Sequence, residues 1–138
     1  MAQHQLAFAS FTISGTTVQP AFWTKYFGLS PDIAITKGDP ISDPTGQNRA
    51  MTRRTGVWGI ESKRHVDSDS LEPHLRHLVE RLALPRPDLR QHVEEAGARM
   101  RFFCYWDNES GHRVPDVPND IRAMMEAMGG TIEVDEYR

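Results

Sequence analysis

The chain has 138 residues, of which 38% are hydrophobic and 25% are charged, and this size and composition are typical of one globular domain. We therefore expect residues 1–138 to form a single α+β domain. The 16 Lys and Arg residues are outnumbered by 19 Asp and Glu residues, which gives a net charge of -3. Because nucleic-acid-binding surfaces are strongly basic, this balance excludes nucleic acid as an expected partner.

Cysteine usage and hydropathy indicate the compartment. Cys104 is the single cysteine, so the chain cannot form an internal disulfide. The first residues lack the basic and then apolar layout of a secretory signal. No apolar run approaches the roughly 20 residues that a membrane helix needs. These features predict a soluble, cytoplasmic protein that has no membrane partner.

The first part of the chain predicts two strands separated by a short helix. Residues 6–14 alternate between two sets of side chains, which indicates a strand. Pro20 suits a first helical turn and Gly28 suits a left-handed cap, so a short aromatic helix is expected between them. Residues 33–35 follow a Ser-Pro pair and predict a second strand.

The middle of the chain begins with a long segment that has no period. Residues 39–55 contain proline and glycine but no helical or strand pattern, and loops of this length are often functional or disordered. A third strand is expected at 56–62, where Trp58 shares a face with Ile60. The Asp and Ser residues at 67–70 supply helix-start chemistry for a helix with a leucine stripe at 71–82.

The last part predicts a helix, a strand, a second helix and a final strand. A break with two prolines introduces the first of these helices, which Gly97 ends. Residues 99–106 carry aromatic side chains on both faces, so this strand is expected inside the sheet. The polar segment at 107–118 precedes a helix that residues 119–120 would cap, and 131–137 alternate as a closing strand.

Taken in order, these elements predict an α+β fold with a five-stranded mixed sheet. The first six main units match the split β-α-β pattern of ferredoxin-like domains. Right-handed crossovers then place the strands in the order 5-4-1-3-2, with strand five parallel to strand four and the helices mainly on one face. The two long loops would lie at opposite ends of this sheet, which argues against one composite active site.

Several short motifs follow one another along the whole chain. They are Gly-Leu-Ser-Pro at 28–31, Lys-Gly-Asp at 37–39, Thr-Gly-Val-Trp-Gly-Ile-Glu-Ser at 55–62, the leucine-rich helix at 71–82 and Ile-Glu-Val-Asp-Glu-Tyr at 132–137. In this order and spacing they resemble the bacterial domain-of-unknown-function family numbered 4279. The resemblance implies a small α+β domain that usually stands alone, and it brings no agreed activity, cofactor or catalytic residue.

The sequence offers little for metal or nucleophilic chemistry. His74 and His77 are spaced like ligands one helical turn apart, but a metal site needs three or four converging ligands. We interpret both as solvent-facing and expect neither a metal nor a cofactor. Cys104 falls in an alternating row with Met100 and Phe102, which favours a core thiol over a nucleophile. No catalytic residue is therefore predicted.

The polar face of the last two strands supports one hypothesis, a small enzyme or small-molecule binder. Glu133, Asp135 and Tyr137 share one face of the closing strand and could provide acid and base groups. Arg99 and Arg101 on the neighbouring strand are the further ligand-binding candidates of this hypothesis, although they could instead pair with these carboxylates. A solvated strand face with structural ion pairs is the simpler interpretation.

The leading hypothesis is a non-enzymatic protein-binding domain. Residues 37–64 hold six cations and three anions, whereas 107–138 hold three arginines and eight carboxylates, and such polarity can steer a charged partner. We expect the partner to contact the 39–55 loop, and an immunity-type protein that neutralises a toxin is one concrete form. A homodimer through a sheet edge is a further hypothesis.

The residues proposed for that contact are three arginines and a tryptophan. Arg49, Arg53 and Arg54 would anchor the partner, and Trp58 would form the base of the surface, because arginine and tryptophan are enriched at interfaces. For Trp58 alone, core packing is the favoured interpretation. The alternative is a stacking platform that its flanking glycines leave open to a ligand or a second backbone.

Overall fold

One mixed sheet organises the fold. The computed structural model describes residues 7–40, 52–107 and 116–137, and within them five strands pair into a single sheet. The strands are β1 (Ala7–Gly15), β2 (Ile33–Ile35), β3 (Gly56–Glu61), β4 (Arg99–Asp107) and β5 (Thr131–Tyr137). Each lies within two residues of a strand predicted from the alternation of side chains.

The strand order is β2-β3-β1-β4-β5. Neighbouring strands are antiparallel except β4 and β5, which are parallel. This is the order and the parallel final pair that the sequence predicts. In the centre, Phe11 lies opposite Ile60 of β3 and Phe102 of β4. The aromatic strand β4 is an inner strand, as expected, and β2 and β5 form the two edges.

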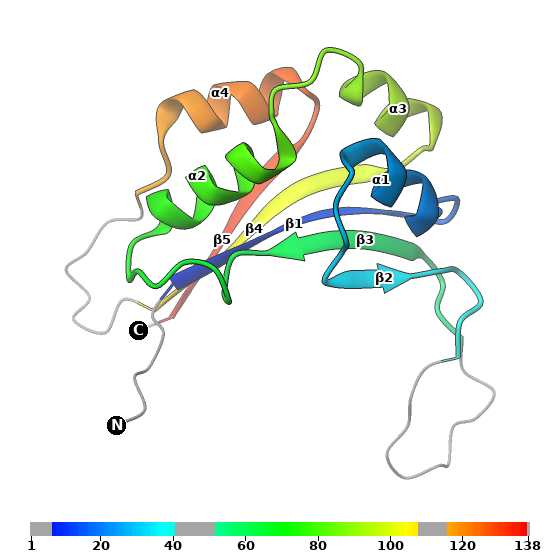
Figure 1. Ribbon diagram of the computed structural model, residues 1–138, viewed down its shortest axis with the longest axis horizontal. Coiled ribbons are helices and arrows are strands. Elements are labelled where there is room, and N and C mark those ends of the chain that lie inside the picture. The colour runs from blue at the N-terminus through cyan, green and yellow to red at the C-terminus, as the bar shows by residue number, and fades with distance from the viewer. Residues whose placement is uncertain (1–6, 41–51, 108–115, 138) are drawn as a thin grey trace, which may run out of the picture.

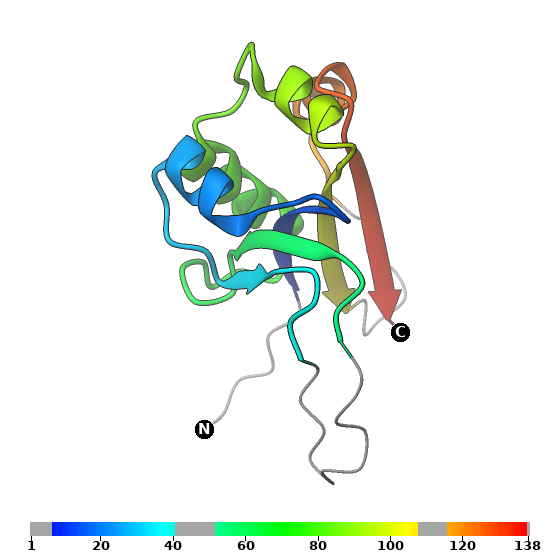
Figure 2. The same cartoon turned by 90° about the vertical axis from the view of Figure 1, so that its right-hand side faces the viewer.

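The helices cover one face of the sheet. They are α1 (Pro20–Phe27), α2 (Leu71–Leu82), α3 (Leu89–Glu95) and α4 (Asn119–Ala127). Figure 1 shows all of them above the sheet, and the turned view in Figure 2 shows the same layering. The architecture is therefore α+β, with helices on one side only within the described residues. In these segments no helix has the length and apolar character needed to cross a bilayer.

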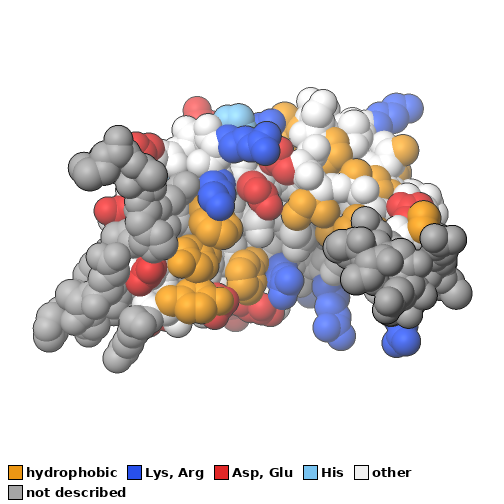
Figure 3. Space-filling view, turned by 90° about the horizontal axis from the view of Figure 1, so that it is seen from below, with side chains coloured by type: hydrophobic (Ala, Val, Ile, Leu, Met, Phe, Trp, Pro, Cys, Tyr) orange, Lys and Arg blue, Asp and Glu red, His pale blue; other side chains and the backbone are white. Residues whose placement is uncertain are grey.

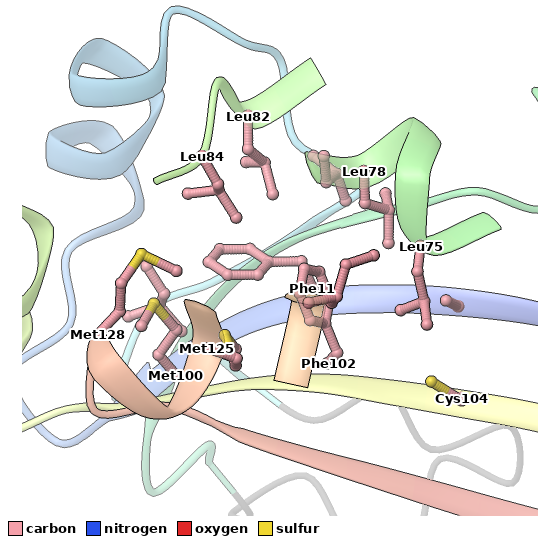
Figure 4. Close-up of a cluster of buried hydrophobic side chains, with 14 of the residues drawn as sticks. Phe11, Leu75, Leu78, Leu82, Leu84, Met100, Phe102, Cys104, Met125 and Met128 are labelled. Carbon is pink, nitrogen blue, oxygen red and sulfur yellow. The ribbon is translucent and has the colours of Figure 1, made fainter. Parts of the chain in front are cut away.

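The hydrophobic core fills the space between the helices and the sheet (Figure 4). Phe11 and Phe102 from the sheet meet Leu75 and Leu78 of α2 and Met125 of α4, and all five are 0% exposed. Burying a side chain of this size contributes about 1.5–3 kcal/mol. The sequence stripes that predict α2 and α4 are thus the faces that these helices bury.

Cys104 also belongs to this core, which confirms the interpretation as a core thiol. The side chain is fully buried, and its sulfur lies among the hydrophobic residues of Figure 4. Burial raises the pKa of the thiol to about 12. Because the thiolate is the reactive form, this cysteine is unsuited to nucleophilic chemistry at neutral pH.

The start of α2 is capped differently from the prediction. Ser70 occupies the N-cap position, but its side chain makes no capping hydrogen bond. The two carboxylate oxygens of Asp116 accept instead, from Leu71 N at 2.8 Å and Glu72 N at 2.9 Å. A carboxylate at a helix N-terminus satisfies free N–H groups and favours the helix dipole. A side chain that precedes α4 in sequence therefore fixes the start of α2.

Candidate functional surface

The side of the sheet that faces away from the helices is a surface available for binding. Side chains alternate along a strand, so the neighbours of the buried core residues point to this side. They include Phe8, Phe103, Tyr105 and Tyr137. Figure 3 looks onto this side and shows hydrophobic side chains gathered over the sheet. No helix or strand from residues 7–40, 52–107 or 116–137 covers it, and we call it the open face.

Three rings on β1, β4 and β5 form an aromatic cluster on the open face. Phe8 stacks on Tyr105 with ring centroids 4.9 Å apart, and Tyr105 contacts Tyr137 at 5.0 Å. The ammonium group of Lys63 lies 5.1 Å from the centroid of Phe8. Tyr137 is 48% exposed, although large hydrophobic side chains are usually covered. The aromatic cluster (Phe8, Tyr105, Tyr137) can therefore offer ring faces to a partner.

A polar hollow of about 490 Å³ lies where β4 and β5 begin. Arg99, Arg101 and Glu133 line it together with Ser14 and Thr131. Arg101 donates to Glu133 across the strands at 2.9 Å, which is the pairing that the sequence makes possible. Arg99 is exposed and makes no ion pair with another described residue. This polar hollow is a concave feature of the open face that could hold a small anion.

Asp135 and Tyr137 lie outside the polar hollow, so the five residues predicted as one ligand site separate into two groups. The hydroxyl of Tyr137 donates to Asp135 at 2.7 Å. This hydrogen bond to a carboxylate raises the pKa of Tyr137. The carboxylate of Asp135 is thus engaged by its own strand neighbour.

The basic residues of the predicted partner site lie next to β3. Arg53 and Arg54 are exposed, and their side chains make no ion pair with another described residue. The backbone of Arg53 is fixed, because it donates to Asp39 O at 2.8 Å and accepts from Gly38 N at 2.9 Å. We call Arg53 and Arg54 the basic rim. The third arginine, Arg49, lies outside the described residues.

Trp58 cannot contact a partner directly, because its side chain is 0% exposed. Its indole Nε1 donates to Thr24 Oγ1 at 3.0 Å, and its ring stacks on Phe27 at 5.0 Å. The predicted role of Trp58 as the base of the binding surface is therefore corrected, and core packing, the favoured interpretation for this residue, describes it. The flanking Gly59 approaches another backbone of the same chain, since a Cβ there would lie 2.8 Å from Phe11 O.

His74 is buried rather than solvent-facing, which corrects the sequence interpretation. The ring is 0% exposed and accepts a hydrogen bond at Nδ1 from Ser62 Oγ, at 2.7 Å. Because the carbonyl of Ser68 can only accept, His74 Nε2 donates to it, at 2.8 Å. Ser62 Oγ in turn accepts from Ala9 N at 2.9 Å. This His74 network ties β1 and the end of β3 to α2.

A Ser-His pair of this kind could suggest nucleophilic catalysis, but its burial argues otherwise. Ser62 and His74 are both 0% exposed, so no substrate reaches the hydroxyl. Burial lowers the pKa of His74, which keeps the ring neutral. The neighbouring His77 stacks on His65 at 5.1 Å. No group of three potential metal ligands occurs in the described part of the chain.

Sequence analysis does not predict the His74 network, because a helical position beside a leucine stripe can face either the core or the solvent. The available signal was the pair formed by Ser62, at the end of a buried strand, and a histidine three residues after Leu71 and four before Leu78. A histidine on the apolar stripe that has a hydroxyl within reach is better interpreted as a satisfied core residue.

Fold and surface together define a small α+β protein with a helical layer on one side of its sheet and an open face on the other. The chain belongs to the family described as Domain of unknown function (DUF4279), which matches residues 4–138. This confirms the resemblance that the sequence motifs indicate. No curated protein and no solved structure matches the chain.

Proposed function

We propose that this protein is a non-enzymatic binding domain that engages another protein through the open face and the basic rim. The observation that carries the proposal is the aromatic cluster, whose outermost ring, Tyr137, is 48% exposed. Aromatic residues and arginine are enriched where proteins meet, and lysine and acidic residues are depleted there. The open face brings such rings together on a rigid sheet.

The charges around the open face support a protein partner of matching polarity. Strand register places Arg53, Arg54 and Arg99 near the end of β1. Asp107 and Asp135 lie near its start, together with Lys63, whose ammonium group contacts Phe8. Such an arrangement orients a partner and raises its association rate. An immunity-type protein, which binds and neutralises a toxin, is the concrete form that we propose.

Two finer inferences accompany this proposal. The order β4-β1-β3-β2 with antiparallel neighbours supports a ferredoxin-like, split β-α-β arrangement of the first four strands. The single cysteine, which is free and buried, supports a location in a reducing cytoplasm. Fractionation of the source cells tests the location, since recovery with secreted proteins would contradict it.

The binding proposal is tested with two matched aromatic substitutions. Phe22 and Tyr137 are large and similarly exposed, at 46% and 48%, but Phe22 lies on α1 and Tyr137 on the open face. The tagged protein is used to capture partners from a lysate of the source cells, and the retained proteins are identified by mass spectrometry. We expect a specific protein to be lost with Tyr137→Ala and with Arg53→Ala/Arg54→Ala, and to remain with Phe22→Ala.

The captured protein is then purified and titrated against each variant by calorimetry. Tyr137→Ala should weaken binding by about tenfold or more, as expected for an interface hot spot. Equal affinity for wild type and Tyr137→Ala would contradict a role for the open face. Light scattering of the protein alone tests the homodimer hypothesis. In that hypothesis the partner is a second copy of the chain that joins through β2 or β5.

The polar hollow favours a second candidate function, the binding of a small anionic molecule. It places the guanidinium groups of Arg99 and Arg101 beside two hydroxyl side chains, with Glu133 as the single carboxylate of its lining. A thermal-shift screen with phosphate and small carboxylates tests this candidate. We expect a rise in melting temperature that Arg99→Gln abolishes. An equal rise in that variant would exclude the polar hollow as the site.

A further inference from the structure

A groove of about 700 Å³ lies on the helical side of the molecule, away from the open face. Its lining residues lie on α4, on the segment that joins α2 to α3, and at the start of α3. Figure 1 shows how these elements are arranged. Six apolar residues contribute to its lining: Pro85, Pro87, Ala123, Met124, Ala127 and Met128. Its volume and mostly apolar lining are typical of sites for small molecules. We call it the α4 groove.

The sequence of α4 explains why this groove stays unfilled. Ile121 and Met125 point into the core, and both are at most 1% exposed. Ala123 and Ala127, one helical turn apart, occupy the side that faces the groove. Their small side chains leave the volume free, and Met124 beside them is flexible and adapts to irregular apolar shapes. The α4 groove is thus an apolar channel about two helical turns long.

A fixed cation borders the α4 groove at Arg86. Its Nε donates to Leu82 O at 2.9 Å and its Nη1 donates to Tyr26 O at 3.2 Å. The guanidinium also lies 4.9 Å from the ring centroid of Tyr26 and 5.0 Å from that of Phe27. Arg86 makes no ion pair with a carboxylate among the described residues. It is therefore a positioned positive charge beside an apolar channel.

The two ends of the α4 groove differ in charge. At the first turn of α4, Asp120 is held by two hydrogen bonds from Arg76, at 2.6 and 3.0 Å, and is neutralised. At the last turn, Arg90 donates to Ala127 O at 3.2 Å and pairs with Glu94 on the exposed side. The lining contains two arginines and one aspartate. Because Arg90 is paired with Glu94, Arg86 is the cation of the lining that has no carboxylate partner among the described residues.

We propose that the α4 groove binds a small amphipathic anion, an unbranched apolar chain with one carboxylate head. The chain lies along Met124 and Met128 between the two prolines, and the head meets the guanidinium groups of Arg86 and Arg90. Apolar contact supplies most of the affinity, because each buried methylene contributes about 0.8 kcal/mol. The charged head sets the orientation. The site is separate from the open face and from the polar hollow.

Methionine methyl groups provide internal probes for this proposal. Protein labelled with ¹³C at the methionine methyls is titrated with octanoate below its micelle concentration and followed by NMR. Met124 is half-buried and lines the groove, and Met128 lines it from the core at 5% exposure, whereas Met100 and Met125 are at most 2% exposed and lie outside the groove lining. We expect saturable shifts for the first pair and much smaller shifts for the second. An absence of saturable shifts at Met124 and Met128 would overturn the proposal.

The chemistry of the ligand is tested with analogues of the same length. 1-Octanol and octyltrimethylammonium keep the chain and change the head, and butyrate keeps the head and shortens the chain. Octanoate should bind more tightly than all three. Equal binding of octanol would overturn the assignment of an anionic head. Equal binding of butyrate would overturn the apolar channel as the site.

Substitutions locate the site without disturbing the core. Ala127→Phe adds a ring on an exposed helical position that lines the groove and should weaken octanoate binding about tenfold or more. Arg90→Gln should weaken it about fivefold through loss of one exposed charge. The matched control is Arg122→Gln, an exposed arginine on α4 outside the groove. Equal losses in Arg90→Gln and Arg122→Gln would contradict a specific contact.

Discussion

The Trp58→Ala substitution is expected to lower the free energy of unfolding by about 3–5 kcal/mol, the range for truncation of a buried aromatic side chain. Trp58 is 0% exposed, stacks on Phe27 and meets Phe11 edge to face. Truncation leaves a cavity between α1 and the sheet and removes the donor that satisfies Thr24. Urea unfolding followed by circular dichroism measures the loss.

The matched control is Phe22→Ala on the same side of the sheet. Phe22 is 46% exposed, so its removal should cost about 1 kcal/mol or less. A Trp58→Ala variant that stays within about 1 kcal/mol of wild type would contradict the packing role. The two substitutions thus separate a core residue from a surface residue.

Much of the fold follows from patterns that are local in the sequence. Alternation along β1 and β4 identifies their core faces, because a strand turns every second side chain to the same side. The leucines of α2 identify its buried stripe in the same way. The rule that crossovers are right-handed then leaves few ways to order five strands, and the predicted order is the observed one.

Such local patterns do not predict contacts between residues that are distant in the sequence. The cap of α2 comes from Asp116, 45 residues after Leu71. The sequence pattern instead predicts a cap from the Asp and Ser residues that directly precede the helix. The His74 network depends on where the end of β3 lies relative to α2. Both depend on the assembled tertiary structure. Sequence periodicity predicts which face is apolar but not which polar partner reaches it.

The candidate sites also combine features that the sequence predicts with features that depend on the tertiary structure. The pairing of Arg101 with Glu133 was predictable, because the residues lie on the shared face of neighbouring strands. Asp135 and Tyr137 are separate from the polar hollow because they lie further along β5, opposite Tyr105 and Asp107 of β4. The α4 groove had no sequence signal, because its two walls come from α4 and from the proline-containing segment near Pro85.

Acidification below neutral pH is expected to destabilise the protein through His74. Burial lowers its pKa in the folded state, whereas an unfolded histidine has a pKa of about 6.5. Below that pH the unfolded chain binds a proton that the folded protein does not, so unfolding becomes more favourable. The contribution is fully present above about pH 6.5 and is lost progressively as the pH falls below it. Desolvation also lowers the pKa of His77, which acts in the same direction.

The His74→Gln substitution separates this effect from the general response to acid. Glutamine does not titrate, so the variant should lose less stability than wild type between pH 7.5 and pH 5.5 in urea unfolding experiments. At pH 7.5 it should be about 1–3 kcal/mol less stable, because Ser62 and the carbonyl of Ser68 lose well-placed partners. An unchanged pH dependence would show that His74 is not the titrating group. A variant as stable as wild type at pH 7.5 would contradict the structural role of the network. The network lies where β1, β3 and α2 meet, so protonation there weakens the attachment of the longest helix to the sheet that carries the open face.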